Sequence, residues 1–164
     1  MAIITLNNNS LSSVTSLPAA IPTGKVLQVV NATFGTATTT SSSTFADLGL
    51  SASITPSSAS NKVLVTVHLS GCQKNNNAVL GTRLVRGSTT IYTIDNVSLF
   101  TNNTNENACG SVSTSYLDTP NTTSATTYKV QFRSVNNAAY VYINNSYSGG
   151  SSSNITLMEI AGWF

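Results

Sequence analysis

The sequence predicts an all-β protein, an antiparallel β-sandwich or jelly roll. Apolar and polar residues alternate in many short segments, the pattern of a strand that buries one face. Such segments recur at about ten-residue spacing, separated by clusters of Ser, Thr, Asn, Gly and Pro, as in sandwiches and jelly rolls. No segment has helical periodicity, and no repeat of fixed length suggests a solenoid or propeller.

The alternation places the strands along the chain. The expected strands are residues 26–33, 44–50, 52–55, 62–70, 78–86, 89–94, 97–101, 110–117, 126–134, 139–144 and 155–161. The clearest is 62–70, in which Val63, Val65, Val67 and Leu69 share one face. A turn at Gly87–Ser88 is expected to join two strands.

The segment 126–134 is expected to point Tyr128, Val130 and Phe132 into the core and the intervening charged and amide residues outward. Residues 139–144 are expected to pair back onto it. The aromatic side chains of Tyr140 and Tyr142 then share one face, for which packing within a sheet is favoured over a platform for sugar rings.

Residues 1–24 are expected to form a short extended arm, and residues 25–164 the folded domain. Ile3, Ile4 and Leu6 could add one strand to a partner, so the arm is interpreted as a docking segment. A frayed terminus is the competing interpretation. The first residues lack the basic group and the long apolar stretch of a signal peptide, so we expect assembly in a cytoplasm.

The scarcity of charge excludes several function classes. Only 7% of residues are charged, and the formal net charge is +2. The basic residues are too scattered to neutralise a row of phosphates, which argues against nucleic acid as a partner. No apolar run approaches the roughly 20 residues of a membrane-spanning helix, and there is no polybasic anchor.

No cluster of residues is typical of a reaction centre, so we expect no enzyme activity, no metal and no cofactor. His68 is the only histidine and is expected to be structural or to lie at a subunit interface. A hydrolase using Asp95 and Asp118 needs the fewest residues, but both lie beside turns or strand ends. Cys72 and Cys109 lack metal-ligand spacing and are expected to be reduced.

Residues near the C-terminus are expected to make subunit contacts. Glu159 lies among apolar residues of the last strand, where a carboxylate needs a partner such as Arg83 or Arg133, in the same or a neighbouring subunit. The terminal Trp163 and Phe164 are large aromatics and are expected to bury against a neighbouring subunit.

Several motifs together resemble the small structural and fibre-type domains of tailed phages of aquatic bacteria, cyanophages included. In chain order they are GKVLQVV (24–30), LGLSASITP (48–56), NKVLV (61–65), LVRGS (84–88), SYLDTP (115–120), TTYKVQFR (126–133) and ITLMEIA (155–161). The layout is also similar to the jelly rolls of tumour necrosis factor and complement heads, which trimerise.

The resemblance implies a homotrimeric knob on a bacteriophage virion, with a jelly-roll fold and no catalytic residues. Tail fibres of this kind usually carry a long shaft, whereas only residues 1–24 precede this domain. We therefore expect a capsid decoration or cement protein that docks onto the major capsid protein, or a small adaptor on a tail protein.

The alternative function is a tail-fibre or adaptor tip that binds a host receptor or glycan. Recognition would then lie in the loops at residues 73–78, 102–108 and 146–153. Their candidate contact residues are Asn75, Asn103, Asn105 and Tyr147.

Overall fold

The computed structural model describes residues 25–99, 108–136, 139–145 and 150–162. These residues form ten strands and no helix. The strands are β1 (Val26–Phe34), β2 (Thr38–Thr40), β3 (Ala46–Ile54), β4 (Lys62–Lys74), β5 (Leu80–Arg86), β6 (Thr89–Ser98), β7 (Ala108–Asp118), β8 (Thr126–Ser134), β9 (Val141–Ile143) and β10 (Ser153–Ile160).

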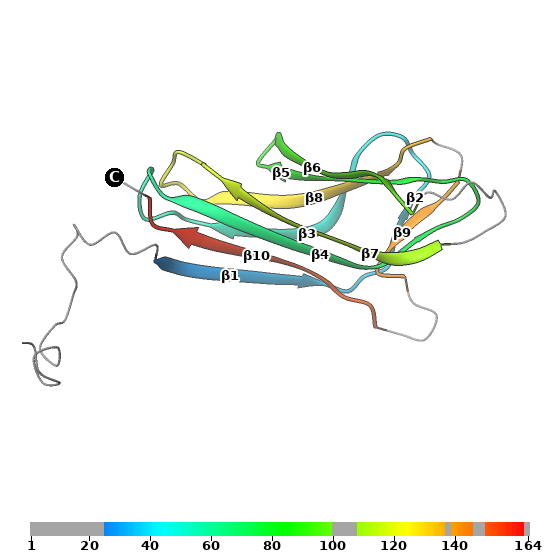
Figure 1. Ribbon diagram of the computed structural model, residues 1–164, viewed down its shortest axis with the longest axis horizontal. Helices are drawn as coiled ribbons and strands as arrows, with labels where there is room; N and C mark the ends of the chain where they lie inside the picture. The colour runs from blue at the N-terminus through cyan, green and yellow to red at the C-terminus, as the bar shows by residue number, and fades with distance from the viewer. Residues whose placement is uncertain (1–24, 100–107, 137–138, 146–149, 163–164) are drawn as a thin grey trace, which may run out of the picture.

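The strands form two antiparallel sheets that face each other across the core (Figure 1). The first sheet has the order β1-β10-β4-β9-β2, and β7 pairs with the other edge of β4. The second has the order β3-β8-β5-β6. The expectation of an all-β sandwich of antiparallel sheets is confirmed.

The two ends of the sandwich are distinct. At one end Val26 of β1 is paired with Ile160 of β10, so the described chain enters and leaves the domain side by side. At the other end lie the end of β4 and the short strands β2 and β9 (Figure 1). We call these the terminal end and the distal end.

Strict alternation builds the core, as the sequence predicts. Val63, Val65 and Leu69 of β4 are completely buried, and Tyr128 and Val130 of β8 face them from the other sheet. The remaining buried apolar side chains come mainly from β3, β5, β9 and β10. Burial of apolar surface of this extent is the main force that holds the two sheets together.

Two pairs of expected strands are single strands. Residues 44–50 and 52–55 fall mostly within β3, because Leu48, Leu50, Ala52 and Ile54 continue one inward-facing row without interruption. Residues 89–94 and 97–101 likewise fall largely within β6, which ends at Ser98. Short polar stretches inside these strands are not breaks in pairing.

The expected pairing of residues 139–144 was wrong. These residues contribute β9, which pairs with β2 and with the end of β4, and therefore belongs to the opposite sheet from β8. The chain leaves β8 after Ser134, where Val135 donates a backbone hydrogen bond to the oxygen of Val79 instead of turning back. Strand β2 was not expected, since three threonines show no alternation.

A β-bulge at Gly71 lets β4 change partners along its length. The pairing of β4 with β7 shifts between Leu69 and Cys72, and Gly71 has φ = 57°. This left-handed conformation suits glycine because it has no Cβ. Beyond the bulge, β4 pairs with β9 through Gln73 and Lys74, so the bulge connects the body of the sheet to the distal end.

We predict that Gly71→Ala destabilises the protein more than Gly87→Ala. Both glycines have a positive φ, but a Cβ at Gly71 would overlap the backbone oxygen of Asn145, whereas a Cβ at Gly87 has nothing within 4 Å. The backbone strain is about 1 kcal/mol for each substitution, and the overlap adds a further loss of about 1–3 kcal/mol at Gly71. Urea unfolding measures both, and equal losses would contradict this explanation.

Candidate functional site

The outer face of the β3-β8-β5-β6 sheet holds charged groups that are already engaged. Lys129 donates to Asp47 at 2.8 Å. The guanidinium carbons of Arg83 and Arg133 lie 4.1 and 4.5 Å from the ring centroid of Phe45, within cation–π distance. This face is therefore a solvated, internally paired surface.

The outer face of the opposite sheet is nearly uncharged. We call it the neutral face and define it as the outward-facing residues of β1, β10, β4 and β7. Its first row is apolar and crosses four strands in direct register: Val29 is opposite Met158, Met158 opposite Leu64, and Leu64 opposite Leu117. With strands about 4.8 Å apart, the row is about 14 Å long.

The exposure of this row is unusual for a lone chain. Val29 is 57% exposed and Leu117 is 49% exposed, while Leu64 and Met158 are half-buried. Single exposed apolar residues are common, whereas contiguous exposed apolar residues are typical of contact surfaces, so this row is a candidate contact surface.

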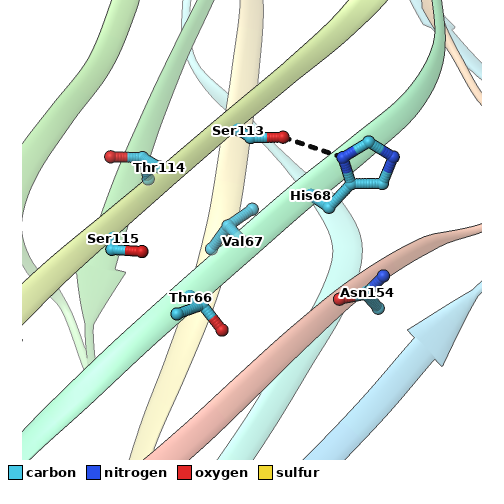
Figure 2. A pocket seen from close by; sticks show the side chains of 7 residues that line it. All are labelled: Thr66, Val67, His68, Ser113, Thr114, Ser115 and Asn154. Carbon is cyan, nitrogen blue, oxygen red and sulfur yellow. Dashed lines mark hydrogen bonds between the residues drawn. The ribbon is translucent and has the colours of Figure 1, made fainter.

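Beside the apolar row the neutral face becomes polar. The next row is Asn31, Thr156, Thr66 and Ser115, and the one after it is Thr33, Asn154, His68 and Ser113. Figure 2 shows the open depression of about 420 Å³ that the residues around His68 line, with the imidazole lying across the sheet toward Ser113.

His68 takes part in a defined hydrogen bond. Its Nδ1 lies 2.8 Å from the Oγ of Ser113 on the neighbouring strand β7 (Figure 2). The bond fixes the ring orientation on the neutral face; whether His68 has a structural or an interface role, the two roles expected from the sequence, stays a prediction. Every described neighbour in the depression is a hydroxyl, an amide or an apolar group, so the local surface can hydrogen-bond but offers no acid–base pair.

At the terminal end, a buried carboxylate ties together three segments. Glu159 is 1% exposed and accepts hydrogen bonds from Gln28 Nε2 at 2.6 Å, from Ser57 N and Oγ at 2.7 Å each, and from Asn61 Nδ2 at 2.5 Å. Asn61 in turn accepts from the backbone nitrogen of Gly162 at 2.9 Å. The start of β1, the β3–β4 loop and the end of β10 therefore share one network.

The expected ion pair of Glu159 with Arg83 or Arg133 was wrong. Both arginines lie on the other sheet, where they stack on Phe45. Glu159 shares the inward-facing side of β10 with Leu157, so it is inside the subunit and is not available for a subunit interface. Burial alone would raise the pKa of Glu159, but the hydrogen bonds from Gln28, Asn61 and Ser57 lower it to about 2.

The distal end carries an aromatic and amide surface. The ring centroids of Tyr140 and Tyr142 lie 6.3 Å apart, and Tyr140 is 51% exposed. Asn75 donates from Nδ2 to the Tyr142 hydroxyl at 3.0 Å. The structure therefore brings Asn75, an expected recognition residue, together with two tyrosines that the sequence analysis favoured as packed residues.

The carboxylates of the hydrolase alternative are separated and already bonded. Asp118 accepts from Arg86 Nη1 at 2.7 Å and from the buried Tyr128 hydroxyl at 2.7 Å. Asp95 is opposite Thr82, four residues along β5 from Arg86, or about 13 Å at 3.3 Å per residue. Glycosidase pairs are about 5–9.5 Å apart, so this arrangement does not fit one.

The described cysteine thiol is not activated. Cys72 is free and fully buried, and burial raises its pKa to about 11 despite a backbone hydrogen bond from Val112. A thiol with such a pKa is protonated at neutral pH and is a poor nucleophile.

The described ranges also bear on metal and membrane binding. No group of three His, Cys, Asp or Glu side chains there could hold a metal ion. None of those residues belongs to a helix of membrane-spanning length and hydropathy.

Several predicted site residues lie outside the described residues. These are the docking residues Ile3, Ile4 and Leu6, the aromatic residues Trp163 and Phe164, and the candidate contact residues Asn103, Asn105 and Tyr147. Their assignments stay predictions.

The apolar row was missed because its four members lie on different strands, each beside a polar residue on the same strand face. Leu64 precedes Thr66 and His68, and Met158 follows Thr156. One such residue carries no signal. The row exists because the register of the strands aligns four such residues, and the sequence alone does not give that register.

Comparison with known proteins gives no identification: no protein-family model matches the chain, and no curated protein matches it.

We predict that Glu159→Gln removes part of the acid sensitivity of the fold. A folded-state pKa of about 2, below the ordinary 4.5, means that Glu159 stabilises the native state above pH 4.5 and loses this contribution as the pH falls toward 2. The loss is about 3 kcal/mol in the wild type. At pH 7 the Glu159→Gln variant should have a lower free energy of unfolding than the wild type. As the pH falls, that free energy should decrease less in the variant than in the wild type.

Urea unfolding at a series of pH values measures this effect. Asp47→Asn is the matched control, because Asp47 is exposed and its partners Lys129 and Gln131 lie at the surface. Parallel pH profiles for Glu159→Gln and the wild type would refute the role assigned to this carboxylate.

Proposed function

We propose that this protein is a structural protein of a bacteriophage virion. It is a homotrimeric knob of jelly-roll fold, attached by an N-terminal arm and placed on the capsid surface as a decoration or cement protein. It is assembled in the host cytoplasm and bound to the major capsid protein. The observation that carries the proposal is the neutral face with its exposed apolar row, a surface suited to permanent contact with other copies.

The strand pairing supports the jelly-roll part of the proposal. Eight strands form four antiparallel pairs that are nested in chain order: β1 with β10, β3 with β8, β4 with β7 and β5 with β6. Two Greek keys wound in this way produce the eight-stranded jelly roll. In tumour necrosis factor-type and complement-head-type jelly rolls, which this sequence resembles, an inner sheet lines the three-fold contact, and we assign that role to the sheet that contains β1, β10, β4 and β7.

The chemistry of the neutral face supports self-association. Its apolar row gains free energy when water is removed, at about 25 cal/mol per Å² of apolar surface. The adjoining rows of hydroxyls and amides can exchange hydrogen bonds between copies. Among the described outward-facing residues of these four strands, Lys62 at the start of β4 is the only charged one. Like-charge repulsion between copies is therefore small.

The terminal end supports attachment by the arm. The network around Glu159 holds Gln28 near the start of β1, and Lys25 accepts a backbone hydrogen bond from Ala161 at 3.0 Å. Lys25 is therefore held at a rigid point at the terminal end. Three arms leaving one end of a trimer would dock together and gain avidity.

A receptor- or glycan-binding tip on a tail protein is the second candidate. The observation that favours it is the aromatic and amide surface at the distal end, which would face outward if the terminal end is attached.

We predict that Val29→Lys and Leu117→Lys each convert the trimer into monomers. Both residues are exposed in one chain, so the substitutions leave the fold intact but place a charge in the proposed contact. Sedimentation equilibrium should give three times 17.1 kDa for the wild type and 17.1 kDa for the variants. Because the face is neutral, the wild-type trimer should persist in 1 M salt, in which charge interactions are screened beyond a Debye length of about 3 Å.

Val97→Lys is the control for the preceding substitutions, since Val97 is 68% exposed on β6 of the other sheet. It should remain trimeric. A wild-type protein that sediments as a monomer, or variants that stay trimeric, would contradict the assignment of the neutral face.

Deletion of residues 1–24 should abolish binding to virions while leaving the trimer intact. The arm carries the apolar residues Ile3, Ile4 and Leu6, and the core that the structure describes is built from residues between Val30 and Leu157. Co-sedimentation with particles measures binding, and the full-length Ile3→Ser/Ile4→Ser/Leu6→Ser variant tests the docking residues alone. Normal particle binding by the truncated protein would show that the arm is not the docking element.

A further inference from the structure

The distal end holds two tyrosines in a fixed arrangement. Their ring centroids are 6.3 Å apart and the ring planes are inclined by 41°. Between and beyond them, Val141 and Ile143 of β9 are completely buried. The buried neighbours anchor the segment and so hold the outward-facing rings in position, with Tyr140 exposed and Tyr142 half-buried.

Amide groups surround these rings. Asn75 donates from its side chain to the Tyr142 hydroxyl at 3.0 Å and from its backbone nitrogen to the oxygen of Tyr140 at 2.9 Å. Gln73 is paired in register with Tyr142, and its Oε1 accepts a hydrogen bond from the side chain of Asn145. The distal patch, defined as Tyr140, Tyr142, Asn75, Gln73 and Asn145, therefore comes from two segments, 73–75 and 140–145, bonded to each other.

The patch contains no charged side chain. Lys74 is adjacent in sequence, but it is completely buried and donates to the backbone oxygen of Asn76. A charged ligand would find no counter-ion in the patch, whereas a neutral ligand with hydroxyl groups would find several donors and acceptors.

These properties match one class of ligand. A pyranose ring has an apolar C–H face and a rim of hydroxyls. Tyrosine rings offer a large, rigid apolar surface with a polar end, and side-chain amides offer both donors and acceptors. The two rings, inclined by 41°, present adjoining apolar surfaces that can contact one or two sugar units.

We propose that the distal patch binds a neutral pyranose unit of a surface saccharide. Tyr140 supplies the stacking surface, and Tyr142 supplies a second apolar surface beside it. Asn75 hydrogen-bonds the sugar hydroxyls, while the buried Gln73 holds Asn145 in position. The proposal does not depend on the trimer or on the virion assignment, because all five residues belong to one chain.

Saturation-transfer NMR on the full-length protein tests the proposal. The probes are methyl α-glucopyranoside, methyl α-galactopyranoside, methyl α-mannopyranoside and maltotriose, with glucuronic acid as the charged comparison. At least one neutral probe should receive saturation, with a millimolar Kd that changes little between low and high salt. Tyr140→Ala should weaken that Kd at least about tenfold, a loss of about 1.4 kcal/mol.

Tyr92→Ala is the matched control, because Tyr92 is also solvent-facing but stacks on Tyr116 outside the patch. It should bind the probe as the wild type does. Asn75→Ala should weaken binding and leave the thermal unfolding of the protein nearly unchanged. Absence of transfer to every neutral probe, preference for the charged sugar, or full binding by Tyr140→Ala would each overturn the proposal. None of these outcomes bears on the oligomeric state, which sedimentation measures separately.

Discussion

The architecture depends on one strand that must satisfy several partners. Strand β4 pairs with β10 along one edge and with β7 along the other, and beyond Gly71 it pairs with β9. Its inward residues Val63, Val65, Val67 and Leu69 form the centre of the core, and its outward residues Leu64, Thr66 and His68 form the centre of the neutral face. A shift of one residue in its register would exchange these two sets, so the core and the neutral face are specified together.

The distribution of polar groups follows from that arrangement. The charged pairs are Lys129–Asp47 on the β3-β8-β5-β6 sheet and Arg86–Asp118, which joins β5 to β7 of the other sheet. The buried carboxylate of Glu159, in contrast, is bonded to neutral donors. At the terminal end, Glu159 stays ionised inside the subunit because four donor groups replace its water. At the distal end, Asn145 donates to the side chain of Gln73, and Lys74 donates to the backbone oxygen of Asn76. These bonds hold the end of β4 and the segment after β9 in place. A sandwich with so few free charges offers contact through apolar surface and hydrogen bonds, and little through electrostatic steering.

Much of the fold could be predicted from the sequence because alternation reports directly on burial. Strands β4 and β8 show this most clearly, since every expected inward residue of Val63–Leu69 and Tyr128–Phe132 is buried. The partner of β9 could not be predicted, because the pairing of Val141–Ile143 depends on where the chain crosses between sheets. The donors around Glu159 could not be predicted either, as Gln28, Ser57 and Asn61 are far from it in sequence and meet only in the folded chain. The tyrosines of the distal patch were recognised as sharing a face, but only the structure gives their exposure.

The central claim is that the protein is a repeated component of a virion surface. Quantitative mass spectrometry of purified particles tests it most directly, by counting copies of this chain against the major capsid protein. If the protein decorates the capsid as a trimer, each particle should contain many copies of it, in a constant ratio to the capsid protein and in multiples of three. A handful of copies would move the protein from the capsid to the tail, and its absence from the particles would contradict the account.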